Sequence, residues 1–447
     1  MFEPKSLSGM GLIEAAETIR EGTVTSRQLV DDCLARIDEH DPAIKAWAHL
    51  KPDHAREQAD ACDKLRRTGK VTGPLHGVPI GIKDIIDTAH VPTEYGSKIF
   101  KGRVPFNDAW VVSRLRNLGA IIIGKTVTAE LANVGPNETR NPHDTSRTPG
   151  GSSSGSAAAV ASYMVPGALG TQTGGSVIRP ASYCGIYGFK PTWGLIPRSG
   201  VLLQSHILDH VGTFGRSVAD AALLAECLMG YDPDDPATSV VNYPQPLAEI
   251  CRQEPPVGVK LGFARTPKWN EAEPATQEAF EELCEVLGDE AEDLDLTGTF
   301  ENAWEWHRTL MNADNAFHYG AIYDKSGDQL HPDLRANIEH GRTVTATQYL
   351  GALQGRERLL EIWDEMLEEY DAIITPAAAG EAPEGLQSTG DAVFCKLWSL
   401  MGVPAVSLPL MVGENGMPLG VQLVGRVGDD AKLLRTANWL VETLSQE

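Results

Sequence analysis

Two short turns of the same sequence, Gly-Gly-Ser, are the part of this chain best suited to chemistry. They are Gly150-Gly151-Ser152 and Gly174-Gly175-Ser176, and their serines stand 24 positions apart. Glycine pairs adopt backbone conformations that other residues avoid, and they bring N–H groups close to a ligand. A serine in such a turn can act as a nucleophile, with the neighbouring N–H groups forming an oxyanion hole.

Two other interpretations of these turns fit the sequence less well. A flexible linker has this composition, but the first turn runs directly into the apolar stretch SAAAVASYMV at 156–165, which is too hydrophobic to stay in water. A phosphate-binding loop would close with Lys-Ser or Lys-Thr, and a dinucleotide site would need GxGxxG after a strand. Neither pattern stands at these turns, so the context favours a catalytic serine.

A nucleophilic serine needs a base, and the sequence points to lysine rather than histidine. The chain has 12 histidines, but no GxSxG nucleophile elbow. Lys83 ends the apolar segment VPIGI at 78–82, and burial would lower its pKa and favour the neutral form that a base requires. The alternative is an ordinary strand-end lysine whose ammonium reaches water. Local sequence alone favours that alternative.

Several ordered motifs resemble those of the amidase signature family. The Gly/Ser-rich stretch over 148–200 has the layout of the hallmark segment of that family, and the resemblance covers most of the chain, being weakest over about 230–390. The other matching segments are GVPIGIKDIIDT at 77–88, TRNPHDTSRTPGGSSSGSAAAVA at 139–161, GTQTGGSVIRPASYCGIYGFKPT at 170–192, and GVPAVSLPL with PLGVQLVGR within 402–426.

The resemblance implies a triad of serine, cis-serine and lysine. It makes Ser176 the nucleophile, Ser152 a bridging serine that follows a cis peptide bond, and Lys83 the general base. Neutral lysine would take a proton from the bridging serine, which would take one from the nucleophile, and no metal or organic cofactor is needed. The other implied site residues are the oxyanion-hole N–H donors Thr173, Gly174 and Gly175, together with Ser176 itself, and Ser153 in the supporting hydrogen-bond network.

The implied activity is hydrolysis of the carbon–nitrogen bond of small-molecule amides through an acyl-enzyme. One alternative keeps the triad and changes the substrate to a carbamate (urethane) or an ester. A less favoured alternative is an amidotransferase subunit that acts only within a complex. A binding protein without catalysis would need one triad residue to be missing, and all three are present.

Two departures from the family pattern bear on the substrate. Many members carry an acid four residues before the nucleophile and an arginine two residues after it. Here those positions hold Gln172 and Ile178, with Arg179 displaced by one; both charges are absent together, so no single buried charge is stranded. The stretch 130–142 is short relative to longer members and would border the acyl pocket. The substrate can therefore differ from those of the better-known members.

Composition limits the partners and the compartment. The 447 residues hold 38 Lys and Arg against 61 Asp and Glu, a net charge of −23. Nucleic acid and anionic membranes are disfavoured, because both bind basic faces. Seven cysteines without CxxC indicate a reducing compartment, and the first residues lack the basic and apolar pattern of a signal peptide. We expect a cytoplasmic protein with a small-molecule substrate, and a homodimer stays open.

The elements that must position these residues follow from apolar periodicity. Residues 10–68 read as helices, with Leu12, Ala15, Ala16 and Ile19 on one face and Thr25 or Ser26 as a cap of the second. The other expected elements are short strands within 76–90 and at 120–124, 259–264, 372–376, 405–409 and 420–424, helices at 109–118, 217–229 and 429–444, a loop over 203–217, and a mostly helical, acidic stretch over 271–371.

This alternation favours an α/β fold. With the resemblance, it predicts a single α/β/α domain over 1–447, with a central mixed sheet covered by helices and with 230–390 as the variable, substrate-facing part. No repeat and no linker long enough to divide the chain is present.

Several other residues have ordinary structural explanations. Cys184 in an apolar run is expected to be buried rather than nucleophilic, Lys190 before Pro191 to be structural, and His76 to pack or to reach the site. Asp84 and Asp87 would cap or pair locally. For the aromatic cluster of Trp304, Trp306, Phe317 and Tyr319, core packing is the expectation, with a contribution to an apolar substrate pocket as the second hypothesis.

Overall fold

One mixed sheet carries the segments that hold the candidate residues. The computed structural model describes residues 6–240, 245–255 and 258–445, and within these residues eleven strands pair in the order β1-β3-β2-β4-β6-β5-β10-β11-β9-β7-β8. The strands are β1 (Trp47–Leu50), β2 (Pro79–Lys83), β3 (Ile121–Thr126), β4 (Gly167–Gln172), β5 (Tyr187–Lys190), β6 (His210–Gly215), β7 (Leu261–Arg265), β8 (Ala291–Asp295), β9 (Ala372–Pro376), β10 (Ala405–Val412) and β11 (Pro418–Val424). Strand β2 is parallel to β3 and β4, and β7 is parallel to β8 and β9; the other pairs are antiparallel.

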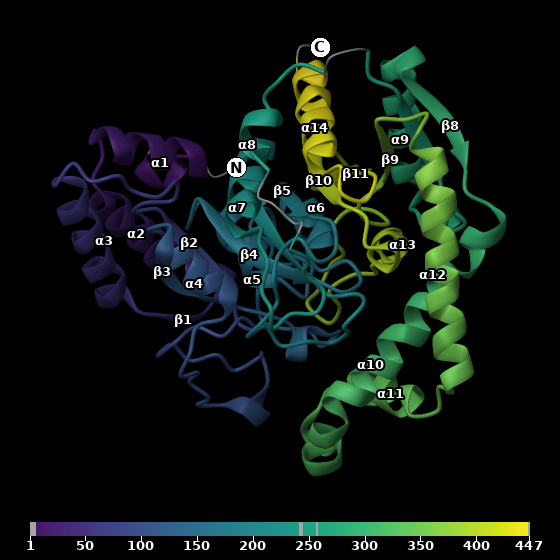
Figure 1. Cartoon of the computed structure of the whole chain (residues 1–447), viewed down its shortest axis with the longest axis horizontal. Helices are drawn as coiled ribbons and strands as arrows, with labels where there is room; N and C mark the ends of the chain where they lie inside the picture. Colours follow the sequence, from purple (N-terminus) through teal and green to yellow (C-terminus); the bar gives the residue numbers. More distant parts are fainter. Residues whose placement is uncertain (1–5, 241–244, 256–257, 446–447) are drawn as a thin grey trace.

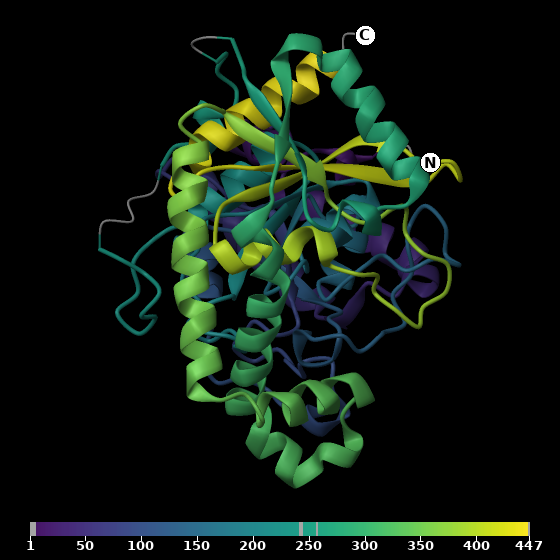
Figure 2. The same ribbon diagram turned by 90° about the vertical axis from the view of Figure 1, so that its right-hand side faces the viewer.

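Helices cover this sheet. They are α1 (Leu12–Glu21), α2 (Ser26–Ile44), α3 (Pro52–Arg66), α4 (Trp110–Asn117), α5 (Ser154–Ala161), α6 (Ile178–Cys184), α7 (Val218–Leu228), α8 (Leu247–Ile250), α9 (Pro274–Leu287), α10 (Ala303–Ser326), α11 (Pro332–Gly341), α12 (Ala346–Met366), α13 (Val393–Met401) and α14 (Asp430–Leu444). Helices α1 to α3 lie at one side of the molecule, and α9 to α12 lie at the other (Figure 1). Turned by 90°, the C-terminal strands lie between α14 and α13 (Figure 2). The predicted α/β fold with a central mixed sheet and covering helices is therefore confirmed.

Local signals in the sequence correctly predicted many elements. The apolar face of the first helix is buried as expected, at Leu12, Ala15, Ala16 and Ile19. Thr25 caps α2 in a capping box, accepting the N–H of Gln28 while the Gln28 side chain accepts the N–H of Thr25. The strand predicted at 372–376 has those bounds as β9.

One expectation about elements is wrong, and two regions that are mostly helical as expected each contain a short edge strand that the sequence did not predict. The loop expected over 203–217 contains β6, whose residues are all buried because β4 and β5 pair on either side of it. The helical region 10–68 is interrupted by the short edge strand β1, which pairs with β3. The helical, acidic stretch 271–371 contains the edge strand β8, whose carboxylates face water. Pairing with distant strands decided each case, and a local pattern does not record it.

Some features are not found among the described residues. No helix there has the length and apolar character needed to cross a bilayer. The same residues hold no cluster of three or more His, Cys, Asp or Glu side chains arranged for a metal ion. All seven cysteines are free thiols.

Candidate active site

Lys83 lies at the end of β2, an inner strand of the sheet that pairs with β3 and β4. Its side chain is fully buried, and its Nζ donates to the hydroxyls of Ser152 and Thr171, each at 2.8 Å. Among the described residues, no carboxylate lies within ion-pair distance of this amine, whereas Lys125 on the neighbouring strand β3 does have such a partner. Burial therefore lowers the pKa of Lys83 well below its usual value, and the charge of Asp209 opposes this shift only in part.

The first Gly-Gly-Ser turn leads into α5 and brings Ser152 to this amine. The peptide bond between Gly151 and Ser152 is cis, as the resemblance implied. Gly150 has φ of 82°, and a Cβ there would meet the backbone of Pro180 at 2.9 Å, so only glycine fits. Ser153 Oγ donates to the carbonyl of Thr171 and accepts its N–H, both at 3.2 Å. Ser153 thereby supports the threonine that contacts the lysine.

The second Gly-Gly-Ser turn connects β4 to α6. The N–H groups of Gly174, Gly175 and Ser176 have no hydrogen-bond acceptor within the part of the chain that the structure describes. Gln172 holds the start of α6, because its Oε1 accepts the N–H groups of Val177 at 2.8 Å and of Ile178. An uncharged side chain thus fills the position where many family members carry an acid, and it leaves the turn's own donors free.

A pocket of about 410 Å³ opens onto Ser176, which is 8% exposed. Several separate segments wall this pocket, including the short stretch 130–142, as expected from the sequence. Its lining residues are Ala132, Asn133, Val134, Thr173, Gly174, Gly175, Ser176, Arg179, Gln204, His307, Met311, Asp333, Gln387, Ser388, Thr389, Gly390, Asp391, Ala392 and Lys396. A second pocket of about 590 Å³ adjoins it and shares the wall residues Val134, His307, Met311, Asp391 and Lys396.

Of the two hydrogen bonds that the proton path would need, the structure has the one between Lys83 and Ser152 and not the one between Ser152 and Ser176. Lys83 and Ser152 are hydrogen bonded, and Ser176 and the three residues before it line the pocket. Within the described residues, no hydrogen bond joins the hydroxyls of Ser152 and Ser176. The contact between base and bridging serine is present in the geometry, whereas the contact between the two serines is not.

Arg179 is a buried cation on the pocket wall. It is 6% exposed, and its Nη2 donates to the carbonyl of Gly151 at 2.6 Å and to Thr389 at 3.3 Å, while its Nε has no partner. No carboxylate of the described residues forms an ion pair with it; Asp391, also on the wall, is paired with Lys396 at 2.9 Å. The guanidinium of Arg179 thus lines the pocket without an ion pair. Its charge also acts on Asp391: burial raises the pKa of that carboxyl, and Lys396 and, to a lesser extent, Arg179 lower it by more.

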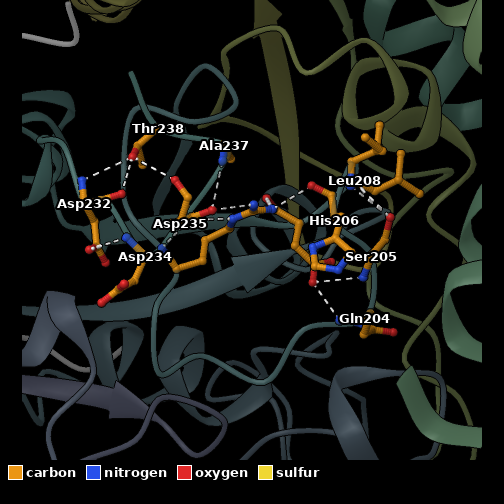
Figure 3. Close-up of polar contacts among 12 residues, drawn as sticks. Gln204, Ser205, His206, Leu208, Asp232, Asp234, Asp235, Ala237 and Thr238 are labelled. Carbon is orange, nitrogen blue, oxygen red and sulfur yellow. Dashed lines mark hydrogen bonds and ion pairs between the residues drawn. The ribbon is translucent and has the colours of Figure 1, made fainter. Parts of the chain in front are cut away.

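The sequence did not predict the residues that form hydrogen bonds with Thr173, which directly precedes the second Gly-Gly-Ser turn. Asp209 Oδ1 accepts the hydroxyl of Thr173 at 2.6 Å, and its Oδ2 accepts the N–H groups of Gln204 and Ser205. Gln204 Nε2 donates to Thr173 Oγ1, and His307 contacts the carbonyl of Thr173 at 3.0 Å. Figure 3 shows the polar contacts of the loop that contains Gln204 and Ser205. No motif or spacing in the sequence marks these residues, because they meet only in the folded chain.

Three residues that the sequence predicted to be structural, or in the case of His76 either structural or near the site, are Cys184, His76 and Lys190. Cys184 is fully buried, and burial raises the pKa of its thiol. His76 contacts the carbonyl of Cys62 at 2.9 Å, which is a packing role. Lys190 is buried at the end of β5 and donates to the carbonyl of Val403, and burial lowers its pKa to about 7.

The two aspartates and the aromatic cluster complete the set of residues singled out by the sequence. Asp84 pairs with Lys125, and Asp87 pairs with Arg103. In the aromatic cluster, Tyr319 is buried as expected, but Phe317 is 78% exposed, so core packing is wrong for that residue. Trp304 lines the second pocket, whose wall also carries charged residues such as Glu301, Glu305 and Arg308, so the contribution of the cluster to an apolar substrate pocket stays a hypothesis.

Comparisons with known proteins bear on the family and the fold of the chain. A family model described as Amidase matches residues 28–434. A glutamyl-tRNA(Gln) amidotransferase subunit of Chloroflexus aggregans is 34% identical over 465 residues, covering 95% of each chain. A chain of the vestigial protein complex that reveals the evolutionary origins of an s-triazine catabolic enzyme superposes with a TM-score of 0.90 at 30% identity, covering 97% of this chain and 98% of that one. The structure of 6-aminohexanoate cyclic dimer hydrolase complexed with substrate has a TM-score of 0.85 at 26% identity, covering 98% and 97%.

Proposed function

The chain belongs to the amidase family, and from that premise we propose that it hydrolyses the carbon–nitrogen bond of small-molecule amides through an acyl-enzyme on Ser176. The observation that carries the proposal is the fully buried amine of Lys83, held at 2.8 Å from the hydroxyl of Ser152 with no carboxylate in ion-pair contact among the described residues. A lysine in that setting favours its neutral form, and a neutral amine can accept a proton.

The proposed proton path runs from Ser176 through Ser152 to Lys83. Neutral Lys83 takes the proton of Ser152 as Ser152 takes the proton of Ser176, and the Ser176 oxygen bonds to the substrate carbonyl carbon. The carbon–nitrogen bond then breaks, and the proton returns along the same path to the leaving amine. Water enters and hydrolyses the acyl-enzyme by the reverse path. We propose that rotation of the Ser176 side chain closes its contact with Ser152 when substrate binds, since catalytic hydrogen bonds often tighten only in the complex.

The free N–H groups of the second turn support this chemistry. Those of Gly174, Gly175 and Ser176 have no acceptor in the described part of the protein, and all three residues line the pocket. Together with the N–H of Thr173, they are the proposed oxyanion hole for the tetrahedral intermediate. One such donor contributes about 10²- to 10³-fold to the rate of comparable hydrolases.

Arg179 supports a substrate class within this proposal. A buried guanidinium that forms no ion pair within the described residues is costly, and a ligand carboxylate is the planar partner that matches its geometry. We therefore propose that the preferred amide carries a carboxylate near its scissile bond. Carbamates and esters that carry such a carboxylate are the alternative substrates, because the Ser176 oxygen can attack their carbonyl carbons in the same way.

An amidotransferase subunit is the second candidate, and the curated relative at 34% identity favours it. The net charge of −23 argues against tRNA binding by this chain. Turnover by the purified chain alone separates the two candidates. A hydrolase turns over amides without a partner, whereas the subunit would be inactive by itself.

The experiment that tests the proposal is a substrate panel with mass-spectrometric capture of the acyl-enzyme. The panel contains anilides, aliphatic amides, carbamates and nitrophenyl esters, each with and without a carboxylate. We expect acylation of Ser176 by amides and its loss in Ser176→Ala. Activity on esters but on neither amides nor carbamates would contradict the proposal, and so would an acyl group on another residue.

A further inference from the structure

Asp209 is a buried carboxylate that forms no ion pair within the described residues. It is 7% exposed, and three uncharged donors satisfy it: the Thr173 hydroxyl at 2.6 Å and the N–H groups of Gln204 at 2.7 Å and Ser205 at 3.1 Å. Burial raises the pKa of this carboxyl, and the Thr173 hydroxyl and the nearby Arg198 guanidinium oppose the rise. An ionised carboxylate held in a region of low dielectric acts strongly on its surroundings.

Two threonines connect this carboxylate to the lysine of the triad. Thr171 Oγ1 contacts Lys83 Nζ at 2.8 Å, and Thr173 Oγ1 contacts Asp209 Oδ1. Thr171 lies in β4, and Thr173 directly follows Gln172, the last residue of that strand. Strand β4 pairs with β6 so that Gln172 lies opposite His210, which puts Asp209 beside Thr173. The buried amine of Lys83 and the buried carboxylate of Asp209 therefore contact threonine side chains two residues apart at the end of β4.

We propose, on the basis of the function proposed above, that Asp209 is a positioning residue whose fixed negative charge stabilises Lys83 while that lysine holds the serine proton. No bond forms or breaks at Asp209: the proton stays between Lys83 and the serines, and the carboxylate stays ionised. Its contact with Thr173 also holds the turn that carries the free N–H groups. One residue thereby links the base to the oxyanion-binding turn.

Three other ionisable groups that act on the carboxylate or feel its charge, Arg198, His318 and Tyr319, do not supply this effect. Arg198 is paired with Asp235, with Nε at 3.0 Å and Nη2 at 2.9 Å from the two carboxylate oxygens. From α10, burial lowers the pKa of His318 and raises that of Tyr319, so both groups are uncharged around neutral pH. The charge of Asp209 raises the pKa of the buried lysine against the effect of its burial.

The experiment measures how fast a serine-directed fluorophosphonate labels Ser176 as a function of pH, followed by intact-protein mass spectrometry. This probe needs no knowledge of the substrate. In Asp209→Asn we expect the plateau rate to fall about 10- to 100-fold, somewhat less than for loss of a direct transition-state contact. We also expect the acidic limb of the profile to move to lower pH, because the lysine loses the charge that favours its protonated form.

Asp430 offers a matched control elsewhere in the fold. It is a fully buried carboxylate that also accepts a threonine hydroxyl at 2.6 Å and a backbone N–H at 2.8 Å, both from Thr192. In Asp430→Asn the acidic limb should stay in place, whatever that substitution does to stability. A purely structural role for Asp209 predicts the same unmoved limb in Asp209→Asn, and that result would overturn the inference.

If Asp209→Asn does not fold, variants of Thr173 provide the test. Thr173→Val removes the hydroxyl but keeps the charge of Asp209, so the plateau labelling rate should fall while the acidic limb of the pH profile stays in place. Thr173→Ser should restore the plateau rate. A limb that moves in Thr173→Val would also overturn the assignment of the shift to the charge. If wild-type Ser176 takes no label at any pH, the proposed function itself fails, which is a different result from a labelled protein with an unmoved limb.

Discussion

Two buried lysines on neighbouring strands allow one substitution to be tested in two settings. Lys83 on β2 and Lys125 on β3 are both fully buried, but Lys125 lies 3.3 Å from the carboxylate of Asp84, whereas Lys83 contacts two hydroxyls. Replacing each lysine with methionine keeps most of the side-chain volume. We predict opposite outcomes: Lys83→Met folds and is inactive, and Lys125→Met is destabilised but active when folded.

The magnitudes follow from what each substitution leaves behind. Removing Lys125 strands the buried carboxylate of Asp84, which costs about 3–5 kcal/mol for such pairs. Burial lowers the pKa of Lys125 to about 8 and raises that of Asp84, so desolvation outweighs their attraction and the lower end of the range, about 3 kcal/mol, applies. Removing Lys83 strands no charge. The variant loses hydrogen bonds that contribute about 1 kcal/mol each. It also no longer bears the desolvation cost of a buried amine, which offsets that loss.

Activity should fall more in Lys83→Met than in Lys125→Met, the reverse of the order expected for the loss of stability. Loss of a general base lowers the rate by about 10²- to 10⁴-fold, so we expect that loss in Lys83→Met and less than about tenfold in Lys125→Met per folded molecule. Urea unfolding followed by tryptophan fluorescence gives the stabilities, and amide turnover or Ser176 labelling gives the activities. Retained activity in folded Lys83→Met, or equal destabilisation of both variants, would refute the reasoning.

The lowered pKa of Lys83 predicts how the free energy of unfolding depends on pH. Because the folded-state pKa of Lys83 lies below its unfolded value, the unfolded chain binds more protons in the interval between the two values. The contribution of Lys83 to the free energy of unfolding therefore rises with pH across that interval. Lys83→Met should lack this rise, and a wild-type stability curve parallel to that of the variant would contradict it.

Three further predictions concern the pocket. Wild-type kcat/KM should rise with pH as Lys83 loses its proton, and a maximum near pH 5 would contradict the base assignment. Gly175→Ala should cost about 1–3 kcal/mol and slow turnover, because its Cβ would meet the Cβ of Ala392 at 2.8 Å, whereas the nearest atom to a Cβ at Gly174 is 3.7 Å away; equal unfolding midpoints and rates for the two alanine variants would show the crowding to be harmless. Arg179→Gln should remove a preference for carboxylate-bearing amides, by about 30-fold or more in kcat/KM, with partial recovery in Arg179→Lys; an unchanged preference would exclude the arginine as the anchor.

The sequence could predict features that contiguous residues determine. The cap at Thr25, the strand at 372–376 and the apolar segment before Lys83 are local signals, since each depends on neighbours within a few positions. The resemblance supplied the cis bond before Ser152, because a run of matching motifs carries a backbone geometry that no composition indicates. These parts of the fold and site follow from the sequence alone.

The remaining parts depend on contacts between distant segments. Asp209 and His307 reach Thr173 from 36 and 134 positions away, and neither belongs to a motif. Strand β6 contains two glycines and reads as a loop until β4 and β5 pair with it. Phe317 shares the helical spacing of its buried neighbours, but helical period does not say which face a partner covers.

The wall of the pocket comes from both halves of the chain. Asn133 and Arg179 lie in the first half, as do the candidate catalytic residues, whereas Met311, Asp333 and the wall residues over 387–392 come from the second half. Under the proposed function, a mutation downstream of position 300 can reshape one side of the pocket while Lys83, Ser152 and Ser176 stay unchanged. A lineage built on this plan can diversify its substrates through that side of the wall, within the limits that Asn133 and Arg179 set on the other.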